Sequence, residues 1–311
     1  MKSVSVVMPS FNSIRTIKAC LASIREQDYE GKVEIVAADG GSTDGTLAVL
    51  KQYNCKIVNE RTGNPEKAKA IGLKEAKGEL VLLMASDNVL PDKLWLKIMV
   101  DSLLKEPEAV AAYPWRYAYR KTDTSLNRYF ALMGVNDPVA WFMGKADRQS
   151  YLGNENQKTK LVKFNQKNMP TLGDNGMLVW RNKLMKAKVD EKNFSHIDVF
   201  YDLVSLGMNQ FVVVKNEIIH DTGESFVKFL SKRFRYMKEL YLEQRKMRRY
   251  KWVRDYQDMA RLGLFVIYSL SLVGPLWTAG RGFLKKPDLA WFWHPVMSAA
   301  MILVYGLALI L

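Results

Sequence analysis

Short apolar runs alternate with amphipathic stretches over the first hundred residues of the chain. Four runs rich in aliphatic residues predict strands: 4–8, 33–38, 56–59 and 80–84. Three stretches between them have the apolar spacing of helices: 13–25, a segment from Thr46, and 67–76. Strands separated by helices of this length indicate βαβ units. The pattern therefore predicts an α/β fold with a parallel sheet.

Polar residues gather where the predicted strands end. The three turns are 9–12, 39–42 and 86–88, and each contains a serine together with an asparagine, an aspartate or both. Ligands of open α/β sheets bind at the carboxyl ends of the strands, near a point where the strand order reverses. We therefore expect one site to be built from these three turns.

The pattern loosens over 114–168, where aromatic and charged residues occur without a clear period. This region is expected to form loops and short helices that wall a site. Two later segments, 173–181 and 212–214, are predicted to return to the sheet as strands. The N-terminal α/β domain is predicted to cover residues 1–225.

The C-terminal part changes character. Residues 226–258 are rich in Lys and Arg and are predicted to form basic amphipathic helices at a membrane interface. Residues 259–311 contain two uncharged segments, 262–280 and 289–311. The second is long enough to cross a hydrocarbon core of about 30 Å, whereas the first is borderline and is interrupted at Gly274. One or two transmembrane helices are expected.

The formal charge of +14 is high for a chain of 311 residues and indicates an anionic partner. Cations alternate with aromatic residues directly before the apolar segments, an arrangement that suits an anionic membrane surface. No nucleic-acid recognition motif accompanies them, so no nucleic-acid partner is predicted. Cys20 and Cys55 have no metal-type spacing and suit a reducing cytosol. A membrane protein with its site on the cytoplasmic face is expected.

Four sequence blocks occur in an order that resembles the family 2 glycosyltransferases, which have a GT-A fold with a Rossmann-like sheet that binds nucleotide sugars. The blocks are 4–12, 39–46, 67–79 and 78–91. Their order and spacing fit over roughly residues 3–100, and more loosely to about 225. The resemblance implies an inverting hexosyltransferase that uses a UDP- or GDP-sugar donor.

Six residues correspond to donor-binding positions of the family. They are Pro9, Ser10, Asn12, Asp39, Lys69 and Ser86. The resemblance implies that Ser10 contacts the nucleoside and that Asp39 reads the base, although Asp39 could instead cap the next helix. Lys69 replaces an arginine of most members, so the charge is kept but the forked geometry is lost.

The family has Asp-x-Asp after the fourth strand, whereas this chain has Ala85-Ser86-Asp87. The resemblance implies that Asp87 binds the Mn²⁺ or Mg²⁺ ion that bridges the donor diphosphate, because these ions favour oxygen ligands. His220 follows a predicted strand and could supply coordination that Ala85 cannot. The alternatives are a simple turn at Asp87 and a buried structural histidine at His220.

Three aspartates are candidates for the catalytic carboxylate: Asp198, Asp202 and Asp174. Asp198 matches the family position best, and it could instead be an acidic charge in the first turn of a helix. The carboxylate would take the proton of an acceptor hydroxyl, or would orient an acceptor phosphate, which is already anionic. His196 and His294 are weaker candidates.

The predicted membrane segments favour a lipid acceptor, such as polyprenyl phosphate or a glycolipid precursor, as in the lipid glycosyltransferases that the chain resembles. Arg233 and Arg235 are candidates to bind the lipid phosphate. Two alternatives remain at this stage. One is an anchored transferase that extends a non-lipid glycan. The other, suggested by Ala85, is a catalytically inactive scaffold that binds nucleotide sugars.

Overall fold

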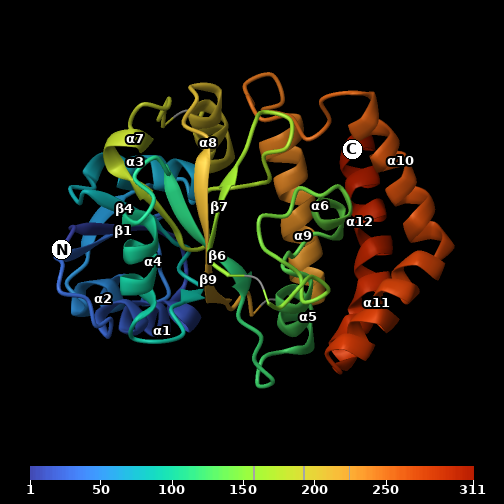
Figure 1. The fold of residues 1–311 in the computed structure, drawn as a ribbon, viewed down its shortest axis with the longest axis horizontal. Helices are drawn as coiled ribbons and strands as arrows, with labels where there is room; N and C mark the ends of the chain where they lie inside the picture. The colour runs from blue at the N-terminus through green and yellow to red at the C-terminus, as the bar shows by residue number, and fades with distance from the viewer. Residues whose placement is uncertain (157, 192, 224) are drawn as a thin grey trace. The chain divides into compact units, whose positions relative to one another are not determined.

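The computed structural model describes residues 1–156, 158–191, 193–223 and 225–311. The chain forms two compact units (Figure 1). The first, which we call the sheet unit, comprises Met1–Ala118 and Gln157–Asp221. The second, which we call the helical unit, comprises Tyr119–Asn156 and Thr222–Leu311.

Within the described residues, the sheet unit contains a nine-stranded sheet of order β3-β2-β1-β4-β8-β6-β9-β5, with β7 paired to β9. The strands are β1 Val4–Ser10, β2 Val33–Asp39, β3 Lys56–Asn59, β4 Leu80–Leu83, β5 Asn88–Val89, β6 Ala111–Tyr117, β7 Lys160–Lys163, β8 Met177–Trp180 and β9 Gln210–His220. The neighbours β3, β2, β1 and β4 are parallel, as predicted. β8 runs antiparallel to β4 and β6.

The described residues of the sheet unit form six helices: α1 Ile14–Arg25, α2 Thr46–Gln52, α3 Pro65–Glu75, α4 Trp95–Leu104, α7 Arg181–Leu184 and α8 His196–Ser205. In Figure 1, α1 and α2 lie on one side of the N-terminal strands and α3 lies on the other. Asn64 caps α3 by accepting the backbone N–H groups of Glu66 and Lys67. A Cβ at Gly72 would lie 2.7 Å from the Val7 side chain, so glycine lets α3 approach β1 closely.

Two parts of the sheet differ from the sequence-based expectation. β9 spans eleven residues rather than three, since it continues from Gln210 to His220. β6 lies partly inside the region predicted to be irregular, and it contains Pro114. Its pairing with β9 shifts register between Pro114 and Arg116. A proline is tolerated in a strand at such an irregularity, because no ladder hydrogen bond is then lost.

The helical unit consists of α5 Ser125–Met133, α6 Pro138–Phe142, α9 Phe226–Tyr236, the π-helix η1 Met237–Leu242, α10 Tyr256–Ser271, α11 Val273–Lys285, the 3₁₀-helix η2 Leu289–Phe292 and α12 Trp293–Ile310. Residues 119–156, which were assigned from sequence to the N-terminal α/β domain, pack within this unit. The basic segment 226–254 is helical only to Leu242. Several like charges follow within one turn of each other at 245–249, which disfavours a continued helix.

One face of α12 carries polar groups into the helical unit. His294 is buried and bonds the hydroxyls of Tyr129 and Tyr268, at 2.9 and 2.8 Å. Tyr305 donates a hydrogen bond to Asp137, which lies directly before α6. The packing of α12 within this unit is therefore fixed by specific polar contacts.

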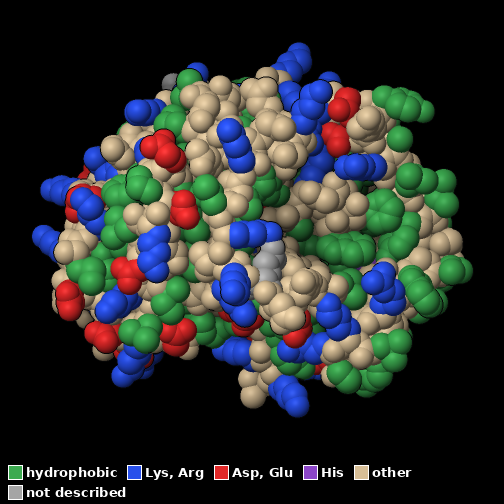
Figure 2. Space-filling view, in the orientation of Figure 1, with side chains coloured by type: hydrophobic (Ala, Val, Ile, Leu, Met, Phe, Trp, Pro, Cys, Tyr) green, Lys and Arg blue, Asp and Glu red, His purple; other side chains and the backbone are tan. Residues whose placement is uncertain are grey.

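Among the described residues, one helical stretch, Leu289–Ile310, is long and apolar enough to cross a membrane, and a third of its most apolar window is buried within the protein. α10 and α11 pass the same test only as a pair, and they are bent by 80° at Leu272, which has a φ of +58°. Figure 2 shows hydrophobic side chains over α10 and α11 of the helical unit. The expected interruption of the first apolar segment is thus a sharp bend.

Candidate active site

The ends of β1 and β2 are joined through the carboxylate of Asp39. Ser10 and Asp39 are paired across the two strands, and the Ser10 hydroxyl donates to Asp39 at 3.0 Å. The hydroxyl of Ser42 and the backbone N–H groups of Gly41 and Ser42 also donate to this carboxylate, at 2.6 to 2.9 Å. Asp39 thus organises the turn after β2. At the start of α2 it is Asp44, one residue before the N-cap Gly45, whose side chain accepts from the Thr46 N–H.

The turn after β1 presents an aromatic ring beside this carboxylate. Asn12 has a φ of +46°, its N–H donates to the Ser42 hydroxyl, and its side chain accepts from the Thr43 N–H. Phe11 is 52% exposed. A Cβ at Gly40 would lie 2.8 Å from the Gly63 Cα and 3.2 Å from the Phe11 ring. Glycine at 40 therefore lets the ring lie close to the turn.

Phe11 was not among the residues predicted from sequence to bind the donor. A large exposed apolar side chain directly after a buried strand, between Ser10 and Asn12, is the signal that could have identified it. Its exposed face is suited to stack on a planar base.

The two predicted metal ligands, Asp87 and His220, lie together. Asn88 pairs with His220 where β5 joins β9, and Nε2 of His220 is 3.5 Å from the Asp87 carboxylate. The Tyr117 ring packs on the imidazole with centroids 5.2 Å apart. Pairing of β5 with β9 therefore forms an oxygen-plus-imidazole pair that the sequence separates widely.

The turn that carries Asp87 is held by its neighbours. Asn88 is buried, and its side-chain oxygen accepts the Ala85 N–H at 2.9 Å. The hydroxyls of Ser86 and Ser13 are 2.9 Å apart. No group of three or more His, Cys, Asp or Glu that could hold a metal occurs among the described residues. An ion at Asp87 and His220 would therefore take its other ligands from a phosphate-bearing ligand and water, as Mg²⁺ commonly does.

Lys69 of α3 lies in a buried ionic cluster rather than in an open basic surface. Its ammonium is 2.6 Å from Asp174 and 3.0 Å from Glu66, and its side chain is 4% exposed. The backbone N–H and Nδ1 of His196, at the start of α8, also contact Glu66, at 2.8 and 2.7 Å. We call Glu66, Lys69, Asp174 and His196 the ionic cluster.

Charges in the ionic cluster stabilise one another. Burial alone would raise the pKa of Glu66, but the charges of His196 and Lys69 hold that pKa far below its usual value. Burial would also raise the pKa of Asp174, but the charge of Lys69 outweighs burial and lowers that pKa below its usual value. The pKa of Lys69 is raised, because attraction to Asp174 and Glu66 exceeds the cost of burial. All three side chains are charged at neutral pH.

Asp174 is linked to the Asp87–His220 pair through its neighbours in the fold. Asn175 follows it in a left-handed conformation, with a φ of +53°, and donates to the Tyr117 hydroxyl at 2.9 Å. Tyr117 in turn packs on His220. Gly176 donates its N–H to the carbonyl of Leu83, which ends β4. The ionic cluster and the metal-ligand pair thus occupy the same edge of the sheet.

The three predicted catalytic aspartates have different surroundings. Asp174 bonds Lys69 as described above. Asp198 is 1% exposed and lies in the first turn of α8. Asp202, one turn later, accepts the Lys188 N–H at 3.4 Å. Asp174 is the one whose contacts join the ionic cluster. Glu66, which contacts both Lys69 and His196, was not predicted from sequence, because its contact with His196 joins residues that are 130 positions apart in the chain.

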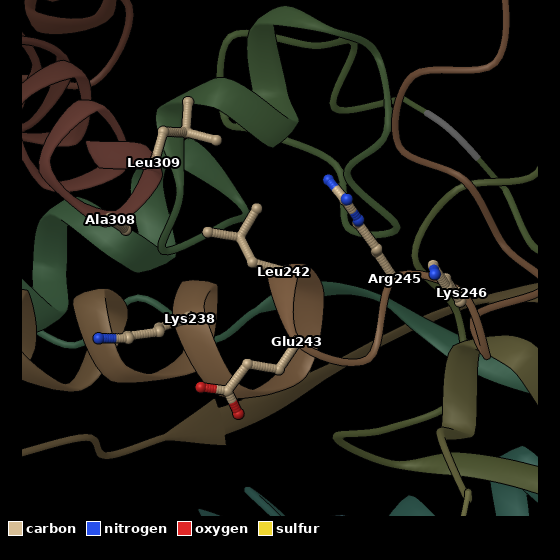
Figure 3. Close-up of a pocket in the computed structure, with 7 residues that line it drawn as sticks. All are labelled: Lys238, Leu242, Glu243, Arg245, Lys246, Ala308 and Leu309. Carbon is tan, nitrogen blue, oxygen red and sulfur yellow. The ribbon is translucent and has the colours of Figure 1, made fainter. Parts of the chain in front are cut away.

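Arg233 and Arg235 of α9 lie in the helical unit. Arg233 donates to the Asn136 side chain and lies over the Phe229 ring, whereas Arg235 is exposed. A separate cavity of about 560 Å³ lies between η1 and the end of α12 (Figure 3). Its lining residues are Lys238, Leu242, Glu243, Arg245, Lys246, Ala308 and Leu309. It combines three cations with an apolar wall.

Comparison with known proteins gives consistent matches. The sequence model described as "Glycosyl transferase family 2" matches residues 5–189. Poly(ribitol-phosphate) beta-N-acetylglucosaminyltransferase TarS of Staphylococcus aureus is 35% identical over 95 residues, which are 28% of this chain and 17% of TarS. An N-acetylglucosaminyltransferase of Bradyrhizobium elkanii is 31% identical over 134 residues, which are 40% of this chain and 72% of that protein.

The fold is also similar to that of a solved structure, the mannosyltransferase PcManGT from Pyrobaculum calidifontis in complex with GDP-Man and Mn²⁺. The match has a TM-score of 0.53 at 17% identity and covers 99% of this chain and 84% of that one. At this identity the likeness concerns the fold. The chain spans less than a fifth of the length of TarS.

Proposed function

Since the chain belongs to glycosyl transferase family 2 and has its GT-A fold, we propose that it is a hexosyltransferase that uses a nucleotide-diphosphate sugar. One observation carries this proposal. The Asp39 turn, the Asp87–His220 pair and the ionic cluster all lie at the carboxyl edge of the N-terminal strands. This is where open α/β sheets bind nucleotides.

The donor is proposed to be a UDP- or GDP-sugar. The turns after β1 and β2 would form the nucleoside site with Pro9, Ser10, Asn12 and Asp39. The exposed Phe11 ring and the rigid, hydrogen-bonded turn beside it support this assignment. Ser86 would face the diphosphate. Lys69 is engaged by two carboxylates, so its proposed role toward the donor is to hold the Asp174 loop in position.

Asp87 and His220 would hold a Mn²⁺ or Mg²⁺ ion against the diphosphate. A carboxylate oxygen and an imidazole nitrogen suit Mn²⁺ in particular, because imidazole is a better ligand for transition metals than for Mg²⁺. Such an ion supplies positive charge that stabilises the leaving diphosphate. The Tyr117 ring orients the imidazole for this purpose.

Transfer is proposed to invert the anomeric configuration by direct displacement. The acceptor oxygen attacks the anomeric carbon while the nucleoside diphosphate leaves from the opposite face. Asp198, Asp174 and Asp202 are the carboxylates proposed from the family resemblance to assist the acceptor. Of the three, Asp174 is favoured by its contacts, because its carboxylate bonds Lys69 and the Asn175 N–H.

The acceptor is proposed to be lipid-linked and presented at the cytoplasmic leaflet. The apolar stretch Leu289–Ile310, the bent pair α10–α11 and the exposed hydrophobic side chains along them support membrane association. The basic residues of 226–258 suit anionic lipids. Arg235 is exposed and is the better placed of the two arginines to meet a phosphate, since Arg233 is engaged by Asn136.

A second candidate is transfer to a glycan chain that is not lipid-linked. This candidate is favoured by the similarity to TarS, which is named a poly(ribitol-phosphate) beta-N-acetylglucosaminyltransferase. Both proposals are tested by incubating the full chain in detergent with UDP- and GDP-sugars, Mn²⁺ and either polyprenyl phosphate, a lipid-linked glycan or a soluble glycan. Transfer to the lipid-linked acceptors alone supports the first proposal. Donor binding without release of nucleoside diphosphate under any condition would indicate an inactive scaffold.

A further inference from the structure

We propose that His196, oriented by Glu66, is the general base of this site, and that the acceptor nucleophile is therefore a hydroxyl rather than a phosphate. This inference rests on the proposed transferase function. His196 takes the role that the family resemblance gives to an aspartate, and the acceptor class becomes an alcohol. The contacts of the imidazole support this assignment.

Glu66 fixes the orientation and the tautomer of His196. Nδ1 of the imidazole is 2.7 and 2.9 Å from the two carboxylate oxygens, and the His196 backbone N–H donates to the same carboxylate at 2.8 Å. Because the carboxylate is ionised, Nδ1 keeps its proton and donates a hydrogen bond to Glu66. In the neutral form of the ring, Nε2 is therefore the nitrogen without a proton, and it is the nitrogen that can act as a general base.

The imidazole also remains accessible. Its side-chain contacts with the described residues all involve Nδ1, and Nε2 makes no hydrogen bond with any of those residues. The side chain is 19% exposed, whereas Asp198 is 1% exposed. A Cβ at Gly173 would lie 3.1 Å from Cδ2 of the ring, the carbon bonded to Nε2. A larger residue at 173 would therefore crowd the imidazole, whereas glycine does not. His196 can thus reach a ligand.

Charged groups of two elements surround the imidazole. Among the described residues, Glu66 and Lys69 of α3 and Asp174 of the loop before β8 face His196. Two carboxylates and one ammonium place a net negative charge beside the ring. A carboxylate at the imidazole also holds its orientation, as the buried aspartate does in serine protease triads.

In the proposed step, Nε2 takes the proton from the acceptor hydroxyl and the acceptor oxygen forms a bond to the anomeric carbon. The bond from that carbon to the diphosphate oxygen breaks. The nucleoside diphosphate leaves with the electron pair. A phosphate acceptor is already ionised at neutral pH and needs no base. An oriented imidazole with a free nitrogen therefore points to an alcohol, such as a sugar hydroxyl of a glycan or glycolipid.

The test compares His196→Asn, Glu66→Gln and the matched control Glu191→Gln with the wild-type full chain. Glu191 pairs with Lys74 at the surface, outside the ionic cluster. Release of nucleoside diphosphate, with a hydroxyl acceptor or with water, should fall roughly 10²- to 10⁴-fold in His196→Asn. The affinity for the nucleotide sugar should stay within twofold. The control should retain wild-type turnover.

The pH profile separates catalysis from a structural effect. Wild-type turnover should fall on the acid side as Nε2 becomes protonated, and this limb should disappear in His196→Asn. Glu66→Gln should lower turnover less than His196→Asn does and should keep a shifted acid limb, since the amide still orients the ring. Turnover in His196→Asn within threefold of the wild type, or an effect on donor KM alone, would overturn the inference.

Two further outcomes distinguish this inference from the proposed function. A wild-type chain that binds no nucleotide sugar would overturn the proposed function and the inference with it. A wild-type chain that glycosylates polyprenyl phosphate in preference to hydroxyl acceptors, at a rate that His196→Asn does not change, would overturn the inference while leaving the transferase function intact.

Discussion

Nε2 of His220 and the carboxylate of Asp87 lie 3.5 Å apart where β5 pairs with β9, although more than a hundred residues separate them in the chain. We propose that this pair compensates in part for Ala85, which stands at the first aspartate position of the family motif. We expect Asp87→Asn to lower metal-dependent turnover roughly 100-fold or more, because the ion loses its charged ligand. Turnover measured over a Mn²⁺ titration checks this. Metal dependence that is unchanged in the variant would argue against the site.

Ala85→Asp offers the opposite change at the same turn. Ala85 is half-buried, and Asn88 holds its backbone N–H. A carboxylate here adds an oxygen ligand, so the concentration of Mn²⁺ that gives half-maximal turnover should fall roughly tenfold. Ser13→Asp is a control on the neighbouring turn that adds the same charge without a ligand at position 85. An equal gain in both variants would indicate a general electrostatic effect instead.

Substitution of Asp39 should weaken donor binding more than it destabilises the neighbouring helix α2. Asp39→Ala removes the acceptor of four hydrogen bonds, which costs roughly 1–3 kcal/mol for the groups left without partners. We expect the affinity for UDP or GDP to fall at least tenfold in a calorimetric titration. Asp44→Ala, the control, removes the acceptor of the Ile14 and Thr46 N–H groups at the starts of α1 and α2, and it should lower the thermal midpoint while leaving nucleotide affinity within twofold. Equal losses of affinity would contradict the assignment.

Particular residues show how far the fold and the site could be predicted from the sequence. The strands up to Leu83 were predicted to within two residues, because their apolar runs end at sharp polar turns. β6 was missed, since Pro114 normally argues against a strand and only the register shift accommodates it. The contact of Glu66 with His196 depends on α3 and α8 meeting in space. No local pattern encodes such a contact, so the ionic cluster could not be predicted.

The ionic cluster should make the protein sensitive to acid. The pKa values of Glu66 and Asp174 are lower in the folded protein than in the unfolded chain. Their stabilisation is therefore fully present above the unfolded values, near 4.5 and 3.8, and is lost as the pH falls through the folded values. Lys69 adds stabilisation that is lost only as the pH rises above its usual value of 10.5. We expect the thermal midpoint to be flat around neutrality and to fall below about pH 4.5.

Glu66→Gln tests the origin of that acid sensitivity. The variant should be less stable than the wild type at neutral pH, and its thermal midpoint should fall less on acidification, because one titrating carboxylate is gone. Lys69→Met should be more damaging at neutral pH, by roughly 3–5 kcal/mol, since it leaves two buried carboxylates without their cation. Parallel acid profiles for the wild type and Glu66→Gln would show that other groups control the transition.

Membrane association should depend on the exposed apolar face of α12. Leu303 and Leu307 are 66% and 50% exposed and lie one turn apart, on a helix whose other face is anchored by His294 and Tyr305. Leu303→Glu combined with Leu307→Glu places two charges where lipid chains would lie, at a cost of about 2–3 kcal/mol each if that face is embedded. The fraction of the full chain that floats with vesicles containing anionic lipid should fall severalfold. The control is Leu206→Glu, an equally exposed leucine of the sheet unit, which should float like the wild type. Flotation that is unaffected by the α12 charges but abolished by high salt would instead assign membrane binding to the basic residues of 226–258.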